Sequence, residues 1–167
     1  MNHNFFKIND SIQYCDYFLN LEIIRRLHDK IYYSNSWGRQ TSSEGEKNFF
    51  WICNLNLDDP VITEEVKHIQ SLVPKKIIRM YVNGQTAFQH GNFHIDDGDK
   101  THLLGLSKDW SYEDGGATEF LDNNSTSFLV YPLFNRLTIF DAKILHRSLP
   151  HTNKNKFRMT LAIKTEE

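Results

Sequence analysis

The sequence predicts a mainly β protein with N-terminal helices, of the jelly-roll type in which two sheets pack face to face and the helices pack on one of them. Apolar residues recur at helical spacing in the first part of the 167-residue chain, and short strands separated by turn residues follow Pro74. Aromatic residues make up 13% of the chain, and large rings fill the space between packed sheets. We expect one domain over residues 1–167, with a helical support region at 1–74 and a jelly-roll core at 75–167.

Two amphipathic helices and one strand are predicted in the support region. The first helix covers about residues 20–33, because its apolar side chains repeat every three or four positions. These side chains are Leu19, Ile23, Ile24, Leu27 and Ile31. The second helix covers about residues 59–72, with an aspartate as its cap and Pro60 in its first turn. Between the helices, Asn48–Cys53 is typical of a short strand.

The predicted core consists of short strands. Lys76–Val82 is the first, Asn83-Gly84 is typical of a hairpin turn, and Gln85–Gln89 is the expected returning strand. Further strands are expected at Thr101–Leu106, Ala117–Phe120, Ser127–Tyr131, Arg136–Phe140 and Phe157–Ile163. Segments rich in Gly, Asn and Asp, such as Asp114-Gly115-Gly116, separate these strands.

Composition and charge narrow the expected functions. The formal net charge is −2, so the charge balance does not favour nucleic acid as a partner. Residues 1–10 lack the apolar run of a signal peptide, and no stretch approaches the ~18 apolar residues that span a membrane. Cys15 and Cys53 lack the spacing of a disulfide framework or a zinc finger, which predicts two buried thiols in a reducing compartment. We therefore expect a cytoplasmic protein with no membrane partner, and nothing in the sequence indicates its oligomeric state.

A histidine and an aspartate lie two positions apart in the segment Phe93-His94-Ile95-Asp96. On an extended strand, residues two positions apart point to the same side, so these two side chains can converge on one cation. Such a pair is a weak signal alone, but His146 follows the β-like run 137–141 and can supply a third ligand. Two histidines and one carboxylate occupy one face of an octahedral ion and leave three positions open. We therefore predict a metal site made of His94, Asp96 and His146.

Candidate residues for binding the carboxylate of a ligand follow the candidate metal ligands along the chain. Arg158 opens the last predicted strand, and Thr160 shares its strand face because strand side chains alternate with a period of two. A guanidinium together with a hydroxyl suits a carboxylate in the interior of a barrel.

Further motifs occur in order along the second half of the chain. They are Arg79-Met80-Tyr81, Asn83-Gly84-Gln85-Thr86, Thr101, Ser107-Lys108-Asp109-Trp110, Gly115-Gly116-x-Thr118-x-Phe120, Pro132, Arg136-Leu137-x-x-Phe140-Asp141 and Pro150. With these motifs and the candidate sites, the sequence resembles the 2-oxoglutarate/Fe(II)-dependent dioxygenase superfamily, and within it the prolyl 4-hydroxylase-like branch. The resemblance runs from about Ile77 to Lys164. Each match is modest, but their order and spacing together are specific.

The resemblance implies a double-stranded β-helix and an enzyme that needs Fe(II), 2-oxoglutarate and O₂, with ascorbate as a further candidate cofactor. It implies that His94, Asp96 and His146 hold the iron. The implied reaction couples oxidative decarboxylation of 2-oxoglutarate, to succinate and CO₂, with hydroxylation of a substrate. Relatives that halogenate have Ala or Gly in place of the carboxylate, so Asp96 points to hydroxylation or a related oxidation.

The resemblance also implies which residues hold 2-oxoglutarate. Arg158 corresponds to the residue that pairs with its distal carboxylate, Thr160 lies beside it, and Tyr81 matches a strand tyrosine that often reaches the cosubstrate. Lys156 is an alternative to Arg158, because collagen-type prolyl hydroxylases use a lysine near that position. We favour Arg158, since it opens an alternating apolar strand, whereas Lys156 belongs to a polar hairpin. Some relatives carry tyrosines in the strand that reads Leu103-Leu104-Gly105-Leu106 in this chain.

Three functions remain open on the sequence alone. The branch resembled favours hydroxylation of a peptidyl residue such as proline. Substrate choice resides in loops that vary freely on one fold, so hydroxylation of a small molecule such as a free amino acid is an alternative. A non-catalytic jelly-roll metal-binding protein is another. The segment 37–47 is expected either to cover the active-site mouth or to form a surface loop, and His151 is expected at the surface.

Overall fold

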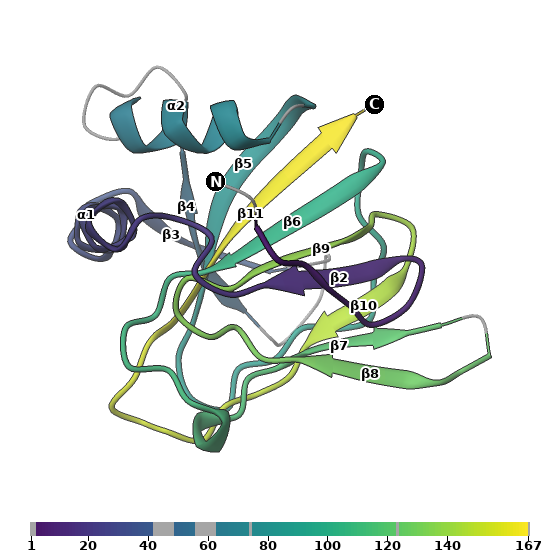
Figure 1. Ribbon diagram of the computed structural model, residues 1–167. Coiled ribbons are helices and arrows are strands. Elements are labelled where there is room, and N and C mark those ends of the chain that lie inside the picture. Colours follow the sequence, from purple (N-terminus) through teal and green to yellow (C-terminus); the bar gives the residue numbers. More distant parts are fainter. Residues whose placement is uncertain (1–2, 42–48, 56–62, 74, 123, 167) are drawn as a thin grey trace.

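The computed structural model describes residues 3–41, 49–55, 63–73, 75–122 and 124–166. Within these residues the chain forms an eight-stranded sheet, a three-stranded sheet and two α-helices (Figure 1). The predicted mainly β fold is confirmed. The predicted first turn of the second helix, and residues 42–47 of the segment between the first helix and the first predicted strand, lie outside the described residues.

The described residues contain the following strands and helices, given in chain order. They are β1 (Phe6–Lys7), β2 (Ile12–Cys15), α1 (Leu21–Tyr32), β3 (Trp37–Gln40), β4 (Phe50–Asn54), α2 (Thr63–Leu72), β5 (Lys76–Gln85), β6 (Lys100–Gly105), the short 3-10 helix η1 (Tyr112–Asp114), β7 (Thr118–Leu121), β8 (Ser127–Val130), β9 (Leu137–Asp141), β10 (Leu145–Ser148) and β11 (Arg158–Glu166). The large sheet has the order β1-β2-β9-β6-β11-β5-β4-β3, and the small sheet has the order β10-β7-β8. The paired strands are antiparallel, so segments far apart in the sequence become neighbours.

Both helices contribute to the same buried apolar cluster as the large sheet. Helix α1 begins after Asn20, whose side-chain oxygen accepts a 2.8 Å hydrogen bond from the Glu22 amide and so caps the first turn. The buried apolar side chains of this cluster include Ile24, Leu27, Ile31, Val66, Ile69, Met80, Val82, Leu104, Met159, Leu161 and Ile163. Figure 1 shows the helices on one side of the large sheet and the small sheet on the other. Among the described residues, no helix is both long and apolar enough to cross a membrane.

A second apolar cluster lies between the two sheets. Its buried members are Ile12, Phe120, Val130 and Phe140. The rings of Phe120 and Phe140 meet edge to face with their centroids 4.8 Å apart. Aromatic rings therefore fill the space between the sheets, as the composition predicted.

Strand β11 separates these two interiors. Its side chains alternate between the sheet faces, and eight of its nine residues are buried. The side chains of Met159, Leu161 and Ile163 join the cluster that includes the helices. The side chains of Arg158, Thr160 and Lys164 instead line a cavity on the opposite face. One strand thus contributes both to the core and to a polar interior.

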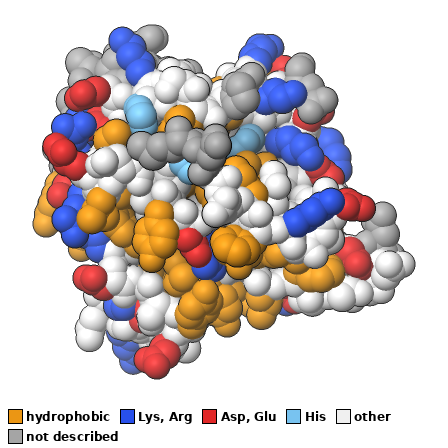
Figure 2. All heavy atoms as spheres, viewed as in Figure 1, with side chains coloured by type: hydrophobic (Ala, Val, Ile, Leu, Met, Phe, Trp, Pro, Cys, Tyr) orange, Lys and Arg blue, Asp and Glu red, His pale blue; other side chains and the backbone are white. Residues whose placement is uncertain are grey.

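Charged side chains of both signs are interspersed over the face shown in Figure 2. Lys and Arg side chains on that face alternate with Asp and Glu and do not form a continuous basic patch among the described residues. This distribution agrees with the balanced charge of the sequence.

The predicted hairpin turn at Asn83-Gly84 is wrong. Strand β5 runs without interruption from Lys76 to Gln85, and Gly84 lies opposite Met159 of β11. Gly84 does not have the positive φ of a hairpin turn. A Cβ at this position would clash with the Phe157 ring and lie 2.8 Å from Trp37 Cζ3. The glycine is therefore explained by two aromatic rings that pack onto the strand, and no returning strand forms at 85–89.

Strands β1, β2, β3 and β10 were not expected from the sequence. Strand β3 pairs with β4 along the edge of the large sheet, so residues 37–40 are part of that sheet. The expectation of a surface loop is therefore wrong for these four residues. Residues 42–47 of the same segment lie outside the described residues.

We predict that Gly84→Ala lowers the free energy of unfolding by about 1–3 kcal/mol, because the added methyl group overpacks the site against Phe157 and Trp37. Gly38→Ala is the matched control, since the nearest atom to a Cβ there is Ile52 O at 4.0 Å. Urea unfolding of the two variants and the parent measures the difference. An equal effect of the two substitutions would contradict the packing explanation.

Candidate active site

Backbone hydrogen bonds position the two histidines of the predicted metal site. The amide of His94 donates to His146 O at 2.9 Å, and the amide of His146 donates to His94 O at 3.0 Å. The amide of Asp96 donates to Ala142 O at 2.8 Å. The extended backbone assumed for His94 and Asp96 forms only this isolated bridge between residues 91 and 99. The bridge joins His94 to His146, and the bond to Ala142 holds Asp96 beside them.

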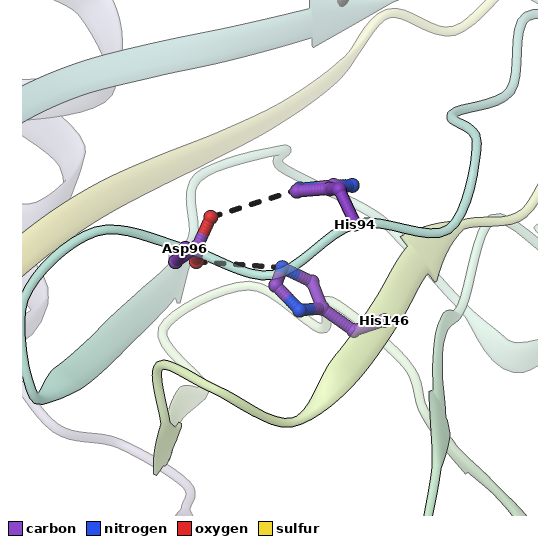
Figure 3. Close-up of side chains that lie close together, drawn as sticks. All are labelled: His94, Asp96 and His146. Atoms are coloured by element: carbon purple, nitrogen blue, oxygen red, sulfur yellow. Dashed lines mark ion pairs between the residues drawn. The ribbon is translucent and has the colours of Figure 1, made fainter.

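The three side chains converge on one point (Figure 3). His94 Nε2 lies 3.7 Å from Asp96 Oδ1, and His146 Nε2 lies 3.4 Å from Asp96 Oδ2. One nitrogen or oxygen atom from each residue falls within 4.8 Å of the others. Adjacent ligand atoms on an octahedral first-row metal ion are roughly 3 Å apart. The donor set therefore fits a divalent metal ion after only a small inward movement.

Each histidine ring is held with its Nε2 directed at the metal position. His94 Nδ1 lies 2.9 Å from Asn92 O, and His146 Nδ1 lies 2.9 Å from Ile144 O. A carbonyl oxygen only accepts, so each contact places the ring proton on Nδ1. The Nε2 lone pair is then available to a metal ion, which is the usual arrangement of a ligating histidine.

The carboxylate of Asp96 is buried between cationic and hydroxyl groups. Its Oδ2 accepts a 2.7 Å hydrogen bond from Thr101 Oγ1 and contacts the Lys164 ammonium. Burial raises the pKa of Asp96, but His146 and Lys164 outweigh it, so the net pKa lies below its usual range. Burial likewise lowers the pKa of Lys164, and Asp96 opposes that shift. The carboxylate is therefore ionised and suited to bind a cation.

These three residues lie on the wall of a cavity of about 120 Å³. Strands β5, β6, β7, β10 and β11 supply most of the remaining wall. The His94 side chain is 49% exposed, whereas those of Asp96 and His146 are 6% and 7% exposed. The site is therefore more open at His94 than at Asp96 and His146. The volume corresponds to several water molecules, so the cavity suits a small dicarboxylate.

Arg158 is buried in the cavity wall and is held by three acceptors. Its Nε donates to Gly116 O at 2.9 Å, one terminal nitrogen to Gln85 Oε1 at 2.7 Å, and the other to Thr118 Oγ1 at 3.4 Å. A guanidinium has five N–H donors, so these bonds leave two for a ligand. Burial lowers the pKa of Arg158 to about 10, which keeps it a cation at neutral pH.

Two buried oxygen atoms in the same cavity have no hydrogen-bond partner among the described residues. They are Thr160 Oγ1 and Asn83 Oδ1. Orphaned polar atoms of this kind are costly unless a ligand or water satisfies them. Tyr81 lines the same cavity, and burial, followed by the charge of Asp96, raises its pKa to about 12, so its hydroxyl stays protonated. The Arg158 guanidinium and the Thr160 and Tyr81 hydroxyls can donate to a carboxylate, whereas Asn83 Oδ1 only accepts and would need a donor from a ligand or water.

Lys156 lies outside this cavity. Its ammonium binds Asp114 Oδ2 at 2.7 Å and contacts Asp109 O. Of the two basic residues considered from the sequence, Arg158 thus lines the cavity and Lys156 does not.

Several residues near the cavity were not anticipated from the sequence. Gln85 and Asn83 share the cavity-facing side of β5 with Tyr81, a pattern that the mistaken hairpin concealed. His151 was expected at the surface but is fully buried, with Nε2 3.1 Å from Gln85 O. Leu103 lines the cavity from the strand that carries tyrosines in some relatives.

No family model matches the sequence, and no curated protein sequence matches it. Several solved structures match the fold. A prolyl 4-hydroxylase from Pseudomonas putida has a TM-score of 0.75 at 14% identity, and the match covers 94% of this chain and 93% of that one. A prolyl hydroxylase from Trichoplax adhaerens, in complex with a hypoxia inducible factor oxygen degradation domain peptide fragment, has a TM-score of 0.75 at 18% identity over 94% of this chain and 84% of that one.

A third solved structure is the viral collagen prolyl hydroxylase of Paramecium bursaria Chlorella virus-1 in its 2-oxoglutarate complex. It has a TM-score of 0.67 at 12% identity, and the match covers 93% of this chain and 95% of that one. At these identities the likeness establishes the fold, and it agrees with the resemblance found in the sequence. This chain has the fold of the prolyl 4-hydroxylases and other 2-oxoglutarate/Fe(II) oxygenases.

Proposed function

We propose that this protein is a 2-oxoglutarate- and Fe(II)-dependent dioxygenase that hydroxylates its substrate. One observation carries the proposal: a single cavity contains both a two-histidine, one-carboxylate cluster and a buried arginine with unused donors. A purely structural metal site would close its coordination sphere, whereas this cluster is open on the His94 side. The same observation therefore disfavours the non-catalytic alternative.

In this proposal His94, Asp96 and His146 would hold Fe(II), and a site of three protein ligands would leave positions for other groups. Bound iron and 2-oxoglutarate together supply the oxidising chemistry, in which O₂ is consumed and 2-oxoglutarate becomes succinate and CO₂. Arg158 binds the distal carboxylate of 2-oxoglutarate through its two unused donors, with Thr160 beside it.

Tyr81 and the cavity wall complete the proposed cosubstrate site. The protonated hydroxyl of Tyr81 is available as a hydrogen-bond donor inside the cavity. The cavity wall limits the orientations that a small dicarboxylate can take.

We further propose that the two sheets form a double-stranded β-helix, that residues 1–167 are one domain, and that the protein is cytoplasmic. The fold match over 94% of the chain supports the single domain. The placement of the cavity between the two sheets supports the double-stranded β-helix.

The substrate we propose is a peptidyl proline. Support comes from the peptide bound to the Trichoplax adhaerens neighbour. A small molecule such as a free amino acid remains the alternative substrate.

We predict that Asp96→Ala abolishes binding of Co(II), used as a stable substitute for Fe(II), while Asp97→Ala leaves it unchanged. Asp96 supplies the only carboxylate among the clustered ligands of the described chain, whereas Asp97 is exposed outside the cluster. Absorption titrations of both variants measure the affinity. Retention of parent-like binding by Asp96→Ala would mean that the metal lies elsewhere.

We predict a new visible absorption band when Fe(II) and 2-oxoglutarate are added to the protein without oxygen. Arg158→Met should weaken 2-oxoglutarate binding roughly 10- to 100-fold, the effect of losing a charge-assisted hydrogen bond of about 1.5–3 kcal/mol. Lys156→Met should leave that affinity unchanged, because Lys156 lies outside the cavity. The band intensity at graded 2-oxoglutarate concentrations gives both values. If iron binds but no band appears, the 2-oxoglutarate assignment fails.

Succinate release distinguishes the two substrate classes. We expect proline-containing peptides to raise it several-fold above the rate without substrate, and the same peptides with alanine in place of proline to have no effect. Stimulation by free amino acids alone would instead support the small-molecule alternative.

A further inference from the structure

Lys164 is a buried cation that makes direct contact with a proposed metal ligand. Its ammonium contacts Asp96 Oδ2 and lies 3.3 Å from Thr101 Oγ1. Thr101 Oγ1 donates to the same Asp96 oxygen at 2.7 Å. The Lys164 side chain is 3% exposed, and Thr101 is fully buried. Two donors from the protein interior therefore converge on one oxygen of the carboxylate.

The sheet itself sets this arrangement. Thr101 on β6 and Lys164 on β11 are direct partners in the antiparallel register, so their side chains leave the sheet side by side on the same face. Asp96 lies in the segment before β6, and its carboxylate contacts both donors. A slip of either strand by one residue would turn the donor on that strand away from its partner.

We propose that Lys164 and Thr101 are positioning residues that keep Asp96 a one-oxygen ligand of the metal. Both donate to Oδ2, which also lies 3.4 Å from His146 Nε2, whereas Oδ1, 3.7 Å from His94 Nε2, accepts from neither of them and is the oxygen we assign to the ion. This inference rests on the proposed function, since it requires a metal ion in the site.

The number of coordination positions on the ion explains why Asp96 should bind it through only one oxygen. A carboxylate binds a metal ion through either one or both oxygens. Two histidines and one carboxylate oxygen fill three of the six octahedral positions. A 2-oxo acid that chelated the ion would take two more and would leave one position open. A second oxygen from Asp96 would fill that last position, so holding Oδ2 away from the ion keeps the site competent.

A competing explanation is that Lys164 merely neutralises Asp96 in the absence of metal. In that case the ammonium and the metal ion would compete for the carboxylate, and removal of Lys164 would tighten metal binding. Under our proposal its removal weakens metal binding, because loss of a group that orients a ligand typically costs 10- to 100-fold in affinity. The direction of the change therefore separates the two explanations.

The experiment measures Co(II) binding to the full chain without 2-oxoglutarate. We expect Lys164→Met and Thr101→Val each to weaken binding roughly 10- to 100-fold and to change the Co(II) absorption spectrum, which reports coordination. Thr101→Ser keeps the hydroxyl and should have the Co(II) affinity and absorption spectrum of the parent protein. Lys143→Met is the matched control, since Lys143 donates to the backbone oxygen of Asp96 at 2.9 Å and not to its carboxylate.

Unchanged or tighter Co(II) binding in Lys164→Met and Thr101→Val would overturn this inference. If Lys164→Met does not fold, as judged by circular dichroism, the Thr101→Val and Thr101→Ser pair decides the question. Failure of the parent protein to bind Co(II) would be a different result, because it would contradict the proposed function itself.

Discussion

Strand β11 is the element on which the rest of this structure depends. It is paired on both edges, with β5 and β6, and its two faces meet different surroundings. Burial of Met159, Leu161 and Ile163 against the helix-side core contributes about 1.5–3 kcal/mol for each side chain. The same alternation forces Arg158 and Lys164 into the opposite interior, where a charge is costly unless it is paired. The stability of the core thus offsets the cost of a polar cavity.

Each buried cation of β11 is compensated in a different way. Lys164 faces a carboxylate, whereas Arg158 is held by neutral acceptors and keeps two donors for a ligand. One of those acceptors is the carbonyl of Gly116, which has a φ of +67°. A Cβ at Gly116 would lie 3.2 Å from Arg158 Cδ, so glycine permits both the backbone conformation and the close approach. Lys164 is therefore paired within the protein, whereas Arg158 keeps donors for an anion.

The candidate site could largely be predicted from the sequence, and the fold could be predicted in outline. Arg158 and Thr160 follow from the two-residue period of a strand, and both do line the cavity. The segment with His94 was expected to be a strand, but its pairing is reduced to one bridge. Gly84 was misassigned because a local Asn-Gly pair fits a hairpin turn and a packing contact equally well. Only the rings of residues distant in sequence distinguish these cases.

The sequence by itself determined which chemical groups are present and which of them share a strand or helix face. Those are local properties, fixed by residue type and by the periods of helix and strand. The tertiary structure alone decided which faces meet. The register between β6 and β11 brought Thr101 beside Lys164, and the bridge to β10 brought His94 to His146. Register between distant strands depends on how the whole core packs, so no local pattern contains it.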